Sequence, residues 1–310
     1  MKNYKKPKIT VIIPCLNSSN TIQRTFDSLR EQDYSNLECI VVDGLSNDNT
    51  LEIIRKNMDI VTTYISEEDS SAAVAQNKGI KLATGDLIGY LHSDDYYSNN
   101  MLKEISSAYV HNKNFDIFSY GIKIQNLSNN KVIMESCSKK NLILNLNNIL
   151  FKHAMGHFYK KNLFDKYGLL KTFDAYGKTL YANDREHLIR LCLLGKRNYV
   201  VEKILYTMGS HVGSNTLSRK NFISIRNNHI EIADIFLRKY SEFPYKKKKL
   251  NDFKAHNTVL LFYYYIANFL LYKALTTFKI GLNNRKITWF YDILISPIKE
   301  IKYRLSVMKW

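Results

Sequence analysis

Two adjacent carboxylates, Asp94 and Asp95, follow a short apolar run and are the first candidates for chemistry in this sequence. Neighbouring carboxylates at the end of a buried strand repel each other unless a positive charge lies beside them. A divalent cation that keeps water ligands and also binds phosphate is the natural partner, so the pair predicts a metal site. The alternative is an ordinary turn, because Asp is common in turns.

Two more acidic residues stand at the borders of expected elements. Asp43 ends a second apolar run, and Asp184 precedes a strongly apolar helical segment. A carboxylate before a helix either caps it or acts as a general base that deprotonates an attacking hydroxyl. The sequence has no GxGxxG after its first apolar run and no GxxxxGK[ST]. Any bound phosphates would therefore be neutralised by a metal ion rather than cradled by a glycine-rich loop.

The elements that position these residues alternate in type. Short apolar runs predict buried parallel strands at residues 9–14, 37–42, 60–65 and 87–91. Helical spacing of apolar residues predicts helices between them, at residues 18–32, 49–57 and 71–83. This order indicates an α/β fold, a Rossmann-like and mostly parallel sheet covered by helices on both faces. Ligands bind at the carboxyl ends of such strands, so the candidate residues should converge there.

Positive charge is concentrated in the last part of the chain. The net charge is +17 over 310 residues, and residues 219–310 contain 18 Lys and Arg against 6 Asp and Glu. We therefore expect two domains, a catalytic domain at 1–218 and a basic, aromatic-rich helical region at 219–310. Within the second region, helices are expected at residues 222–240, 252–280 and 288–296, with a charged hinge at 243–249.

The basic region suggests a membrane surface as partner. The four lysines at 246–249 and the aromatic stretch at 260–272 favour docking on anionic lipid. The alternative is that this helix packs as ordinary core. Residues 255–272 reach the minimum length of a spanning helix, but their His, Asn and Tyr residues argue against a span. No nucleic-acid-binding motif is present, so no nucleic-acid partner is expected.

Four scattered cysteines indicate the compartment. They form no CxxC pair and no zinc-finger spacing, so we expect reduced thiols, as in a cytoplasmic protein. No secretory signal is visible at the start of the sequence. The expected location is the cytoplasm, at the inner face of the plasma membrane.

Three ordered segments resemble the family 2 glycosyltransferases of GT-A fold: residues 10–17, 39–50 and 77–95. The resemblance continues more weakly past Asp184 and covers roughly residues 8–215. It implies inverting, metal-dependent transfer of a sugar from a nucleotide-sugar, commonly a UDP-sugar. The acceptor would be a glycan or lipid-linked glycan in cell-surface polysaccharide biosynthesis. The alternative is a catalytically inactive protein of the same fold that binds nucleotide-sugars or glycans.

The same resemblance implies roles for individual residues. Asp184 would be the catalytic base, and Asp95 would hold Mn²⁺ or Mg²⁺. The implied donor-binding residues are Pro14, Asn17, Asp43, Asp69, Asn77 and Asp94. Possible acceptor-side residues are His153, His157 and Glu186, although a structural role explains each histidine more readily.

Two departures from the family pattern concern donor and acceptor choice. The segment 67–71 lacks the glycines common in relatives, and 211–214 stands where relatives often have Gly-Gly-x-Ser.

Overall fold

The structure is a computed structural model that describes residues 5–151, 156–173, 177, 179–210, 221–268, 270, 273–274 and 276–278. The chain packs into two compact units. The first contains Met1–Thr172 and His187–Val212, and the second contains Phe173–Glu186 and Gly213–Trp310.

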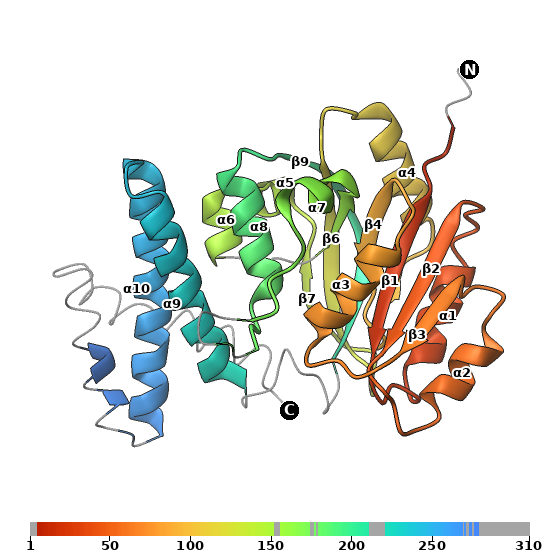
Figure 1. The fold of residues 1–310 in the computed structure, drawn as a ribbon, viewed down its shortest axis with the longest axis horizontal. Helices are drawn as coiled ribbons and strands as arrows, with labels where there is room; N and C mark the ends of the chain where they lie inside the picture. Colours follow the sequence, from red (N-terminus) through yellow and green to blue (C-terminus); the bar gives the residue numbers. More distant parts are fainter. Residues whose placement is uncertain are drawn as a thin grey trace. The chain divides into compact units, whose positions relative to one another are not determined.

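The first unit is built on one nine-stranded sheet (Figure 1). Its strands are β1 (Ile9–Cys15), β2 (Leu37–Asp43), β3 (Thr63–Ser66), β4 (Leu87–Tyr90), β5 (Tyr96–Tyr97), β6 (Ile117–Asn126), β7 (Val132–Ser136), β8 (His157–Lys160) and β9 (Asn198–Ser210). Their order is β3-β2-β1-β4-β8-β6-β9-β5, and β7 pairs with β6. The strands from β3 to β4 are parallel, whereas β8 pairs with both of its neighbours in antiparallel fashion.

Helices connect these strands and cover the sheet. The helices described are α1 (Ile22–Arg30), α2 (Thr50–Lys56), α3 (Ala72–Leu82), α4 (Met101–His111), α5 (Lys139–Leu142), α6 (Leu146–Phe151), α7 (Asn162–Tyr167), α8 (Asn183–Leu193), α9 (Phe222–Lys239) and α10 (Pro244–Ala267). In Figure 1, α3 lies in front of the parallel strands and α1 lies behind them. Every residue of β1 is buried, which explains why its sequence is apolar without alternation. The predicted α/β fold with helices on both faces is therefore confirmed.

The register brings the carboxyl ends of the parallel strands to one edge of the sheet. Cys15 at the end of β1 is opposite Asp43 at the end of β2, and Asp43 is opposite Ser66 at the end of β3. The residues that follow these strands therefore leave the sheet side by side, as the sequence predicts.

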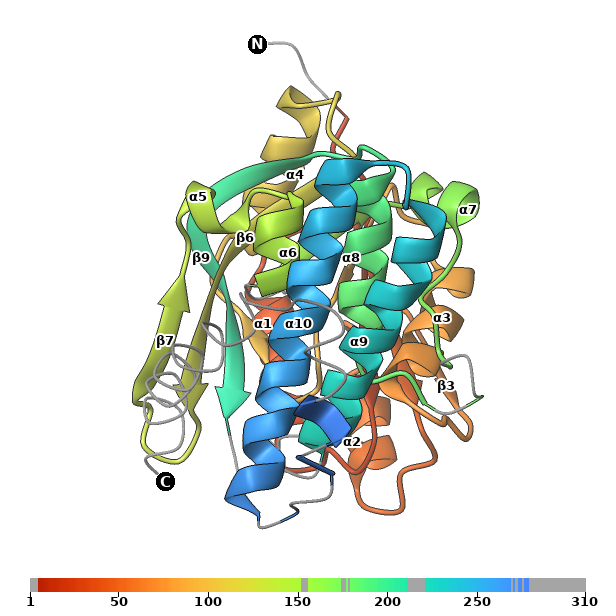
Figure 2. The same cartoon turned by 90° about the vertical axis from the view of Figure 1, so that its left-hand side faces the viewer.

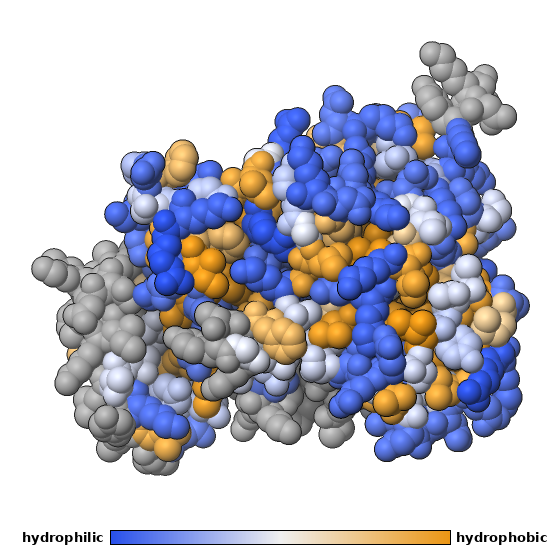
Figure 3. Space-filling view, viewed as in Figure 1, coloured by the Kyte–Doolittle hydropathy of each residue, from blue (hydrophilic) through white to orange (hydrophobic). Residues whose placement is uncertain are grey.

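In the second unit, α9 and α10 pack along each other as a helical hairpin (Figure 2). Buried apolar side chains hold the two helices together, among them Phe236, Phe253 and Val259. A polar contact lies between them as well, since His229 Nδ1 is 2.9 Å from Asn257 Oδ1. At the turn between the helices, Figure 3 shows apolar surface beside strongly hydrophilic side chains.

The hairpin corrects one prediction. The charged hinge expected at 243–249 is wrong, because α10 begins at Pro244, where a proline suits the first helical turn, and runs through all four lysines. The aromatic stretch expected at 260–272 is divided between core and surface. Leu260, Leu261 and Tyr265 are buried, residues 262–264 are half-buried, and Ile266 and Leu270 are exposed. The helix expected at 288–296 lies outside the described residues. Within the part of the chain that the structure describes, no helix is long and apolar enough to cross a membrane.

Candidate active site

The loops after β1 and β2 are bonded to each other at the carboxyl edge of the sheet. The Asn17 N–H donates to Ser46 Oγ at 2.8 Å, and the Asn47 N–H donates to Asn17 Oδ1 at 2.9 Å. Asn17 has a φ of 49° and Leu45 a φ of 62°, both in the left-handed region. Asn adopts this region more readily than most residues, which suits Asn17 to the turn. The two loops are therefore held in shape by the protein itself.

Asp43 connects several segments at the carboxyl edge through hydrogen bonds. Its buried carboxylate accepts hydrogen bonds from the Ser46 hydroxyl and from the Ser46 N–H at 3.0 Å. It also accepts one from Ser66 Oγ at 2.7 Å. The side chain predicted to contact the nucleotide is therefore already bonded to the loop after β2 and to the end of β3. Pro14, also predicted to bind the donor, is buried within β1.

Asp48, which the sequence analysis did not single out, links the same loops. It accepts hydrogen bonds from the Thr50 N–H at 3.0 Å and from the Ser19 N–H at 3.1 Å. Burial alone would raise its pKa, but the hydrogen bonds from Thr50 and Ser19 lower the pKa to about 2. The position of Asp48 just before α2 is the sequence signal that could have identified it.

The segment after β4 joins this edge through serine side chains. Ser18 Oγ and Ser93 Oγ are 2.8 Å apart, so the loop after β1 contacts the segment that contains Asp94. Arg24 on α1 donates to the Asp94 carbonyl at 2.9 Å, and its guanidinium lies 4.6 Å from the centre of the Tyr96 ring. Three strand ends thus converge at one edge.

Asp95, the predicted metal ligand, is almost completely buried. Its carboxylate accepts hydrogen bonds from the Tyr206 hydroxyl and from the Gly209 N–H at 2.7 Å, both on β9. Burial raises the pKa of Asp95 well above its usual range, and the neighbouring Asp94 raises it further, against the opposing hydrogen bonds. A metal ion at Asp95 would have to reach a buried carboxylate, each of whose oxygens already accepts one hydrogen bond.

Asp94 differs from its neighbour because its side chain is only half-buried. β9 lies directly against its backbone, since a Cβ on Gly209 would collide with the Asp94 carbonyl oxygen. The segment is therefore fixed from both sides, by Arg24 and by β9, while the Asp94 carboxylate stays partly accessible.

Two of the implied donor residues are occupied by internal contacts. The Asp69 side chain is 7% exposed, and its carboxylate lies 2.7 Å from Lys78 Nζ. Burial raises the pKa of Asp69 despite the opposing effect of Lys78. The Asn77 amide bonds the backbone of Leu170 in both directions, donating to its carbonyl at 2.8 Å and accepting from its N–H at 3.0 Å. Asn77 therefore fixes the segment that follows α7.

The implied base and acceptor-side residues lie elsewhere in the chain. Asp184 is exposed in the first turn of α8 and Glu186 is buried, and both belong to the second compact unit. The helix begins earlier than expected, so Asp184 lies within it rather than before it. His157 Nδ1 is 2.7 Å from Ser119 Oγ, in the first unit. His153 lies outside the described residues.

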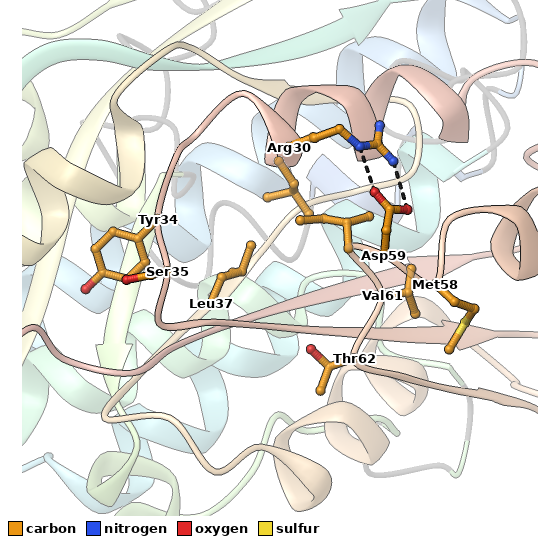
Figure 4. A pocket seen from close by; sticks show the side chains of 10 residues that line it. Arg30, Tyr34, Ser35, Leu37, Met58, Asp59, Val61 and Thr62 are labelled. Carbon is orange, nitrogen blue, oxygen red and sulfur yellow. Dashed lines mark hydrogen bonds and ion pairs between the residues drawn. The ribbon is translucent and has the colours of Figure 1, made fainter.

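A surface pocket of about 280 Å³ lies at the opposite, amino-terminal edge of the strands (Figure 4). It is lined by the first residue of β2, Leu37, and by residues just before β3. Its charged side chains pair with each other, because Arg30 Nε lies 2.9 Å from the Asp59 carboxylate. This pocket is therefore separate from the converging strand ends.

The oxygen atoms at the carboxyl edge suit a divalent metal ion that takes some of its ligands from the protein and the others from a bound substrate. Among the described residues, no group of three or more His, Cys, Asp or Glu side chains is arranged to hold an ion. Mg²⁺ and similar ions are commonly bound by one or two carboxylates, substrate phosphates and water. The half-buried carboxylate of Asp94 meets that requirement.

The fold and the polar strand ends define the class of protein first: an α/β protein of GT-A type. Staphylococcus aureus TarS residues 1–349, solved with UDP-GlcNAc, has a similar fold, with a TM-score of 0.66 at 20% identity. The match covers 89% of this chain and 79% of that one. A mannosyltransferase from Pyrobaculum calidifontis, solved with GDP-Man and Mn²⁺, gives a TM-score of 0.59 at 15% identity, covering 97% of this chain and 83% of that one.

The family follows from the sequence. The family model described as glycosyl transferase family 2 matches residues 10–168, just over half of the chain, and the chain belongs to that family. A poly(ribitol-phosphate) β-N-acetylglucosaminyltransferase, TarP of Staphylococcus aureus, is 27% identical over 201 residues, 63% of this chain and 60% of TarP. The chain spans 60% or less of the length of the first curated relatives that it matches.

Proposed function

We propose that the protein is an inverting, metal-dependent glycosyltransferase that takes a hexosyl or N-acetylhexosaminyl group from a nucleotide-sugar, a UDP-sugar. The acceptor is a glycan or lipid-linked glycan in cell-surface polysaccharide biosynthesis. Family membership supports the reaction class. The names of TarP and of the TarS complex support UDP-GlcNAc as the first donor to test.

The observation that carries the proposal is the convergence of three strand ends around Asn17, Asp43 and Asp94. The loops are held by internal hydrogen bonds, so a nucleotide meets a site that is already ordered. Leu16 and Leu45, each 56% exposed, offer apolar surface for a base beside these polar groups. A few polar groups beside apolar surface are typical of a ligand site.

We assign the metal to Asp94 rather than Asp95, because Asp94 is half-buried whereas Asp95 is buried and each of its oxygens already accepts a hydrogen bond. When bound, a divalent ion supplies charge neutralisation to the diphosphate leaving group. Asp43, Asp48 and Ser93 hold the surrounding loops, and Arg24 fixes the Asp94 backbone. Asn77 and Asp69 act indirectly, because Asn77 fixes the backbone at Leu170 and Asp69 pairs with Lys78.

Asp184 is the proposed general base, which removes the proton from the attacking acceptor hydroxyl. Its exposure and its place in the first turn of α8 support this role, because both leave the carboxylate accessible. Glu186 and His157 remain the proposed acceptor-side residues. An inverting transfer needs a base on one face of the sugar and a stabilised leaving group on the other, as in inverting glycoside hydrolysis.

The catalytic domain proposed at 1–218 would act at the inner face of the plasma membrane, with the basic region 219–310 against anionic lipid. The net charge of that region supports this location, because its 18 Lys and Arg residues and 6 Asp and Glu residues give +12.

Thermal unfolding with UDP, UDP-GlcNAc or GDP-Man, each with and without Mn²⁺, tests donor binding. A ligand at 100 times its Kd adds about 2.7 kcal/mol to the free energy of unfolding. We expect Mn²⁺-dependent stabilisation by UDP-GlcNAc and UDP. Stabilisation by none of these nucleotides would overturn the proposal.

Asp184→Asn tests catalysis separately from binding. We expect donor-induced stabilisation to persist while donor hydrolysis falls by about 10²-fold or more, the range for loss of a general base. If the wild type binds donors but hydrolyses none and transfers to no acceptor, the protein is the inactive binding protein instead.

A further inference from the structure

The turn of the helical hairpin exposes two aromatic rings. Phe243 is 51% exposed and Tyr245 is 60% exposed, where α9 ends and α10 begins. Figure 3 shows apolar surface at this turn among hydrophilic side chains. Large apolar side chains at the tip of a hairpin, away from its buried seam, are free to contact another surface.

Basic residues surround these rings. The hairpin turn, defined as residues 238–249, contains six Lys and Arg and one Glu, a net charge of +5. Arg238, Lys239, Lys247 and Lys248 are all exposed in the structure. The turn therefore combines apolar rings with strong positive charge on one small surface.

The lysines lie directly beside the rings. Lys246 Nζ is 4.7 Å from the ring centres of both Tyr240 and Phe243, and Lys249 Nζ is 5.7 Å from that of Tyr245. These distances are within the range of cation–π attraction. The ammonium groups and the rings are thus presented together, so a partner that binds one also meets the other.

The hairpin below the turn is well anchored. Phe236, Leu250 and Phe253 are buried on the two sides of its seam. Lys254 Nζ lies 2.7 Å from the Asp234 carboxylate and joins the two helices across it. The turn is therefore held in place by packing that does not depend on its own exposed residues.

We propose that the hairpin turn docks on an anionic lipid membrane, with Phe243 and Tyr245 in the headgroup region and the lysines on lipid phosphates. This deepens the proposed membrane association, on which it rests, by naming the contact surface. Charge complementarity accounts for the lysines, because each basic residue near an anionic surface strengthens binding. The exposed rings favour lipid over a soluble polyanion, since they suit an interface that is apolar on one side and wet on the other.

Vesicle flotation of the full chain tests the proposal without a donor. We expect binding to vesicles that contain phosphatidylglycerol and little binding to neutral phosphatidylcholine. Replacing the four lysines at 246–249 by Gln should weaken binding by about 10²-fold or more. Phe243→Ser should weaken it by about tenfold, and this loss should persist in high salt, because salt does not screen the apolar term.

Matched controls separate the turn from general charge and apolarity. Lys139→Gln with Lys140→Gln removes two exposed charges on α5, and Met58→Ser removes a side chain that is 47% exposed. Neither control should change flotation by more than about twofold. UDP-induced stabilisation should be the same in every variant, which shows that each is folded and keeps the donor test independent.

The proposal is overturned by equal flotation on neutral and anionic vesicles, by flotation on neither, or by equal loss in the controls and the turn variants. If polyphosphate binds as tightly as vesicles and Phe243→Ser changes neither affinity, the turn recognises soluble polyanions rather than lipid. If UDP does not stabilise the wild-type protein, the proposed donor site is refuted, but the membrane-docking proposal is not.

Discussion

The two edges of the parallel strands have similar side chains and use them differently. At the amino edge, buried Glu38 accepts hydrogen bonds from Thr10 Oγ1 at 2.6 Å and from the Thr84 N–H at 2.8 Å, and it pairs with Lys8 at 2.7 Å. At the carboxyl edge, Asp43 and Asp95 are bonded just as fully, but Asp94 beside them stays half-buried.

This difference indicates what each carboxylate contributes. A carboxylate whose oxygens are all bonded within the protein contributes to folding, because removing it leaves buried donors without partners. A carboxylate that remains accessible at a crowded polar edge is available to a ligand. In the adjacent pair at 94–95, Asp95 is buried and Asp94 is half-buried, so the two carboxylates differ in their access to a ligand.

Asp94→Asn should produce the largest effect. We expect the fold to persist, Mn²⁺-dependent stabilisation by UDP to disappear, and transfer to fall by about 10²-fold or more, the scale for losing one electrostatic contact to developing charge. Titration calorimetry of UDP with Mn²⁺ and thermal unfolding of the apo protein measure the two effects.

Asp95→Asn is the matched control at the neighbouring position. We expect it to lower the apo unfolding free energy by about 1–3 kcal/mol, because an amide cannot accept both hydrogen bonds from Tyr206 and Gly209. If Asp95→Asn instead removes metal dependence from a fully stable protein, the assignment to Asp94 is wrong.

Glu38→Gln should act on stability alone. Burial would raise the pKa of Glu38, but hydrogen bonds from Lys8, Thr10 and Thr84 lower it from 4.5 to about 2. The folded protein therefore binds fewer protons than the unfolded chain between these values. The Glu38 carboxylate therefore stabilises the fold above pH 4.5, and this contribution is lost as the pH falls toward 2.

The measurement is chemical denaturation from pH 7 to pH 3. We expect Glu38→Gln to lower the unfolding free energy by about 2 kcal/mol at pH 7, with a difference from wild type that shrinks as the pH falls. UDP affinity should be unchanged. A difference that grows in acid would show that Glu38 does not act through its charge.

Arg30→Gln should have the smallest effect. The Arg30 side chain is 43% exposed and pairs with Asp59 beside the pocket of Figure 4. Exposed ion pairs contribute about 1 kcal/mol or less, so the denaturation midpoint should hardly move, and UDP binding should not change. Loss of UDP binding would place a ligand site at the amino edge and break the contrast between the edges.

The parallel half of the fold could be predicted from the sequence because its signals are local. The runs that became β1 and β2 are apolar throughout, as strands buried on both faces must be. Since parallel strand ends meet at one edge, the convergence of Asn17, Asp43 and Asp94 followed directly.

The roles of individual carboxylates could not be predicted in the same way. The partners of Asp95 lie on β9, more than a hundred residues along the chain, and no local pattern identifies them. The hinge prediction is wrong for another reason, because a run of four lysines does not by its charge distinguish a hinge from a helix. Lys is a good helix former, and the proline before the lysines suits a helix start.

The contact between Asp95 and β9 also affects how this protein can be recombined with its relatives. Tyr206 and Gly209 meet the two Asp95 oxygens, and Gly209 has no room for a side chain beside the Asp94 carbonyl. An insertion or deletion between Tyr206 and Gly209 would shift one contact out of register and move the segment containing Asp94. Chimeras that exchange the following segment should therefore have their junction after Gly209 and keep the spacing of three residues from Tyr206.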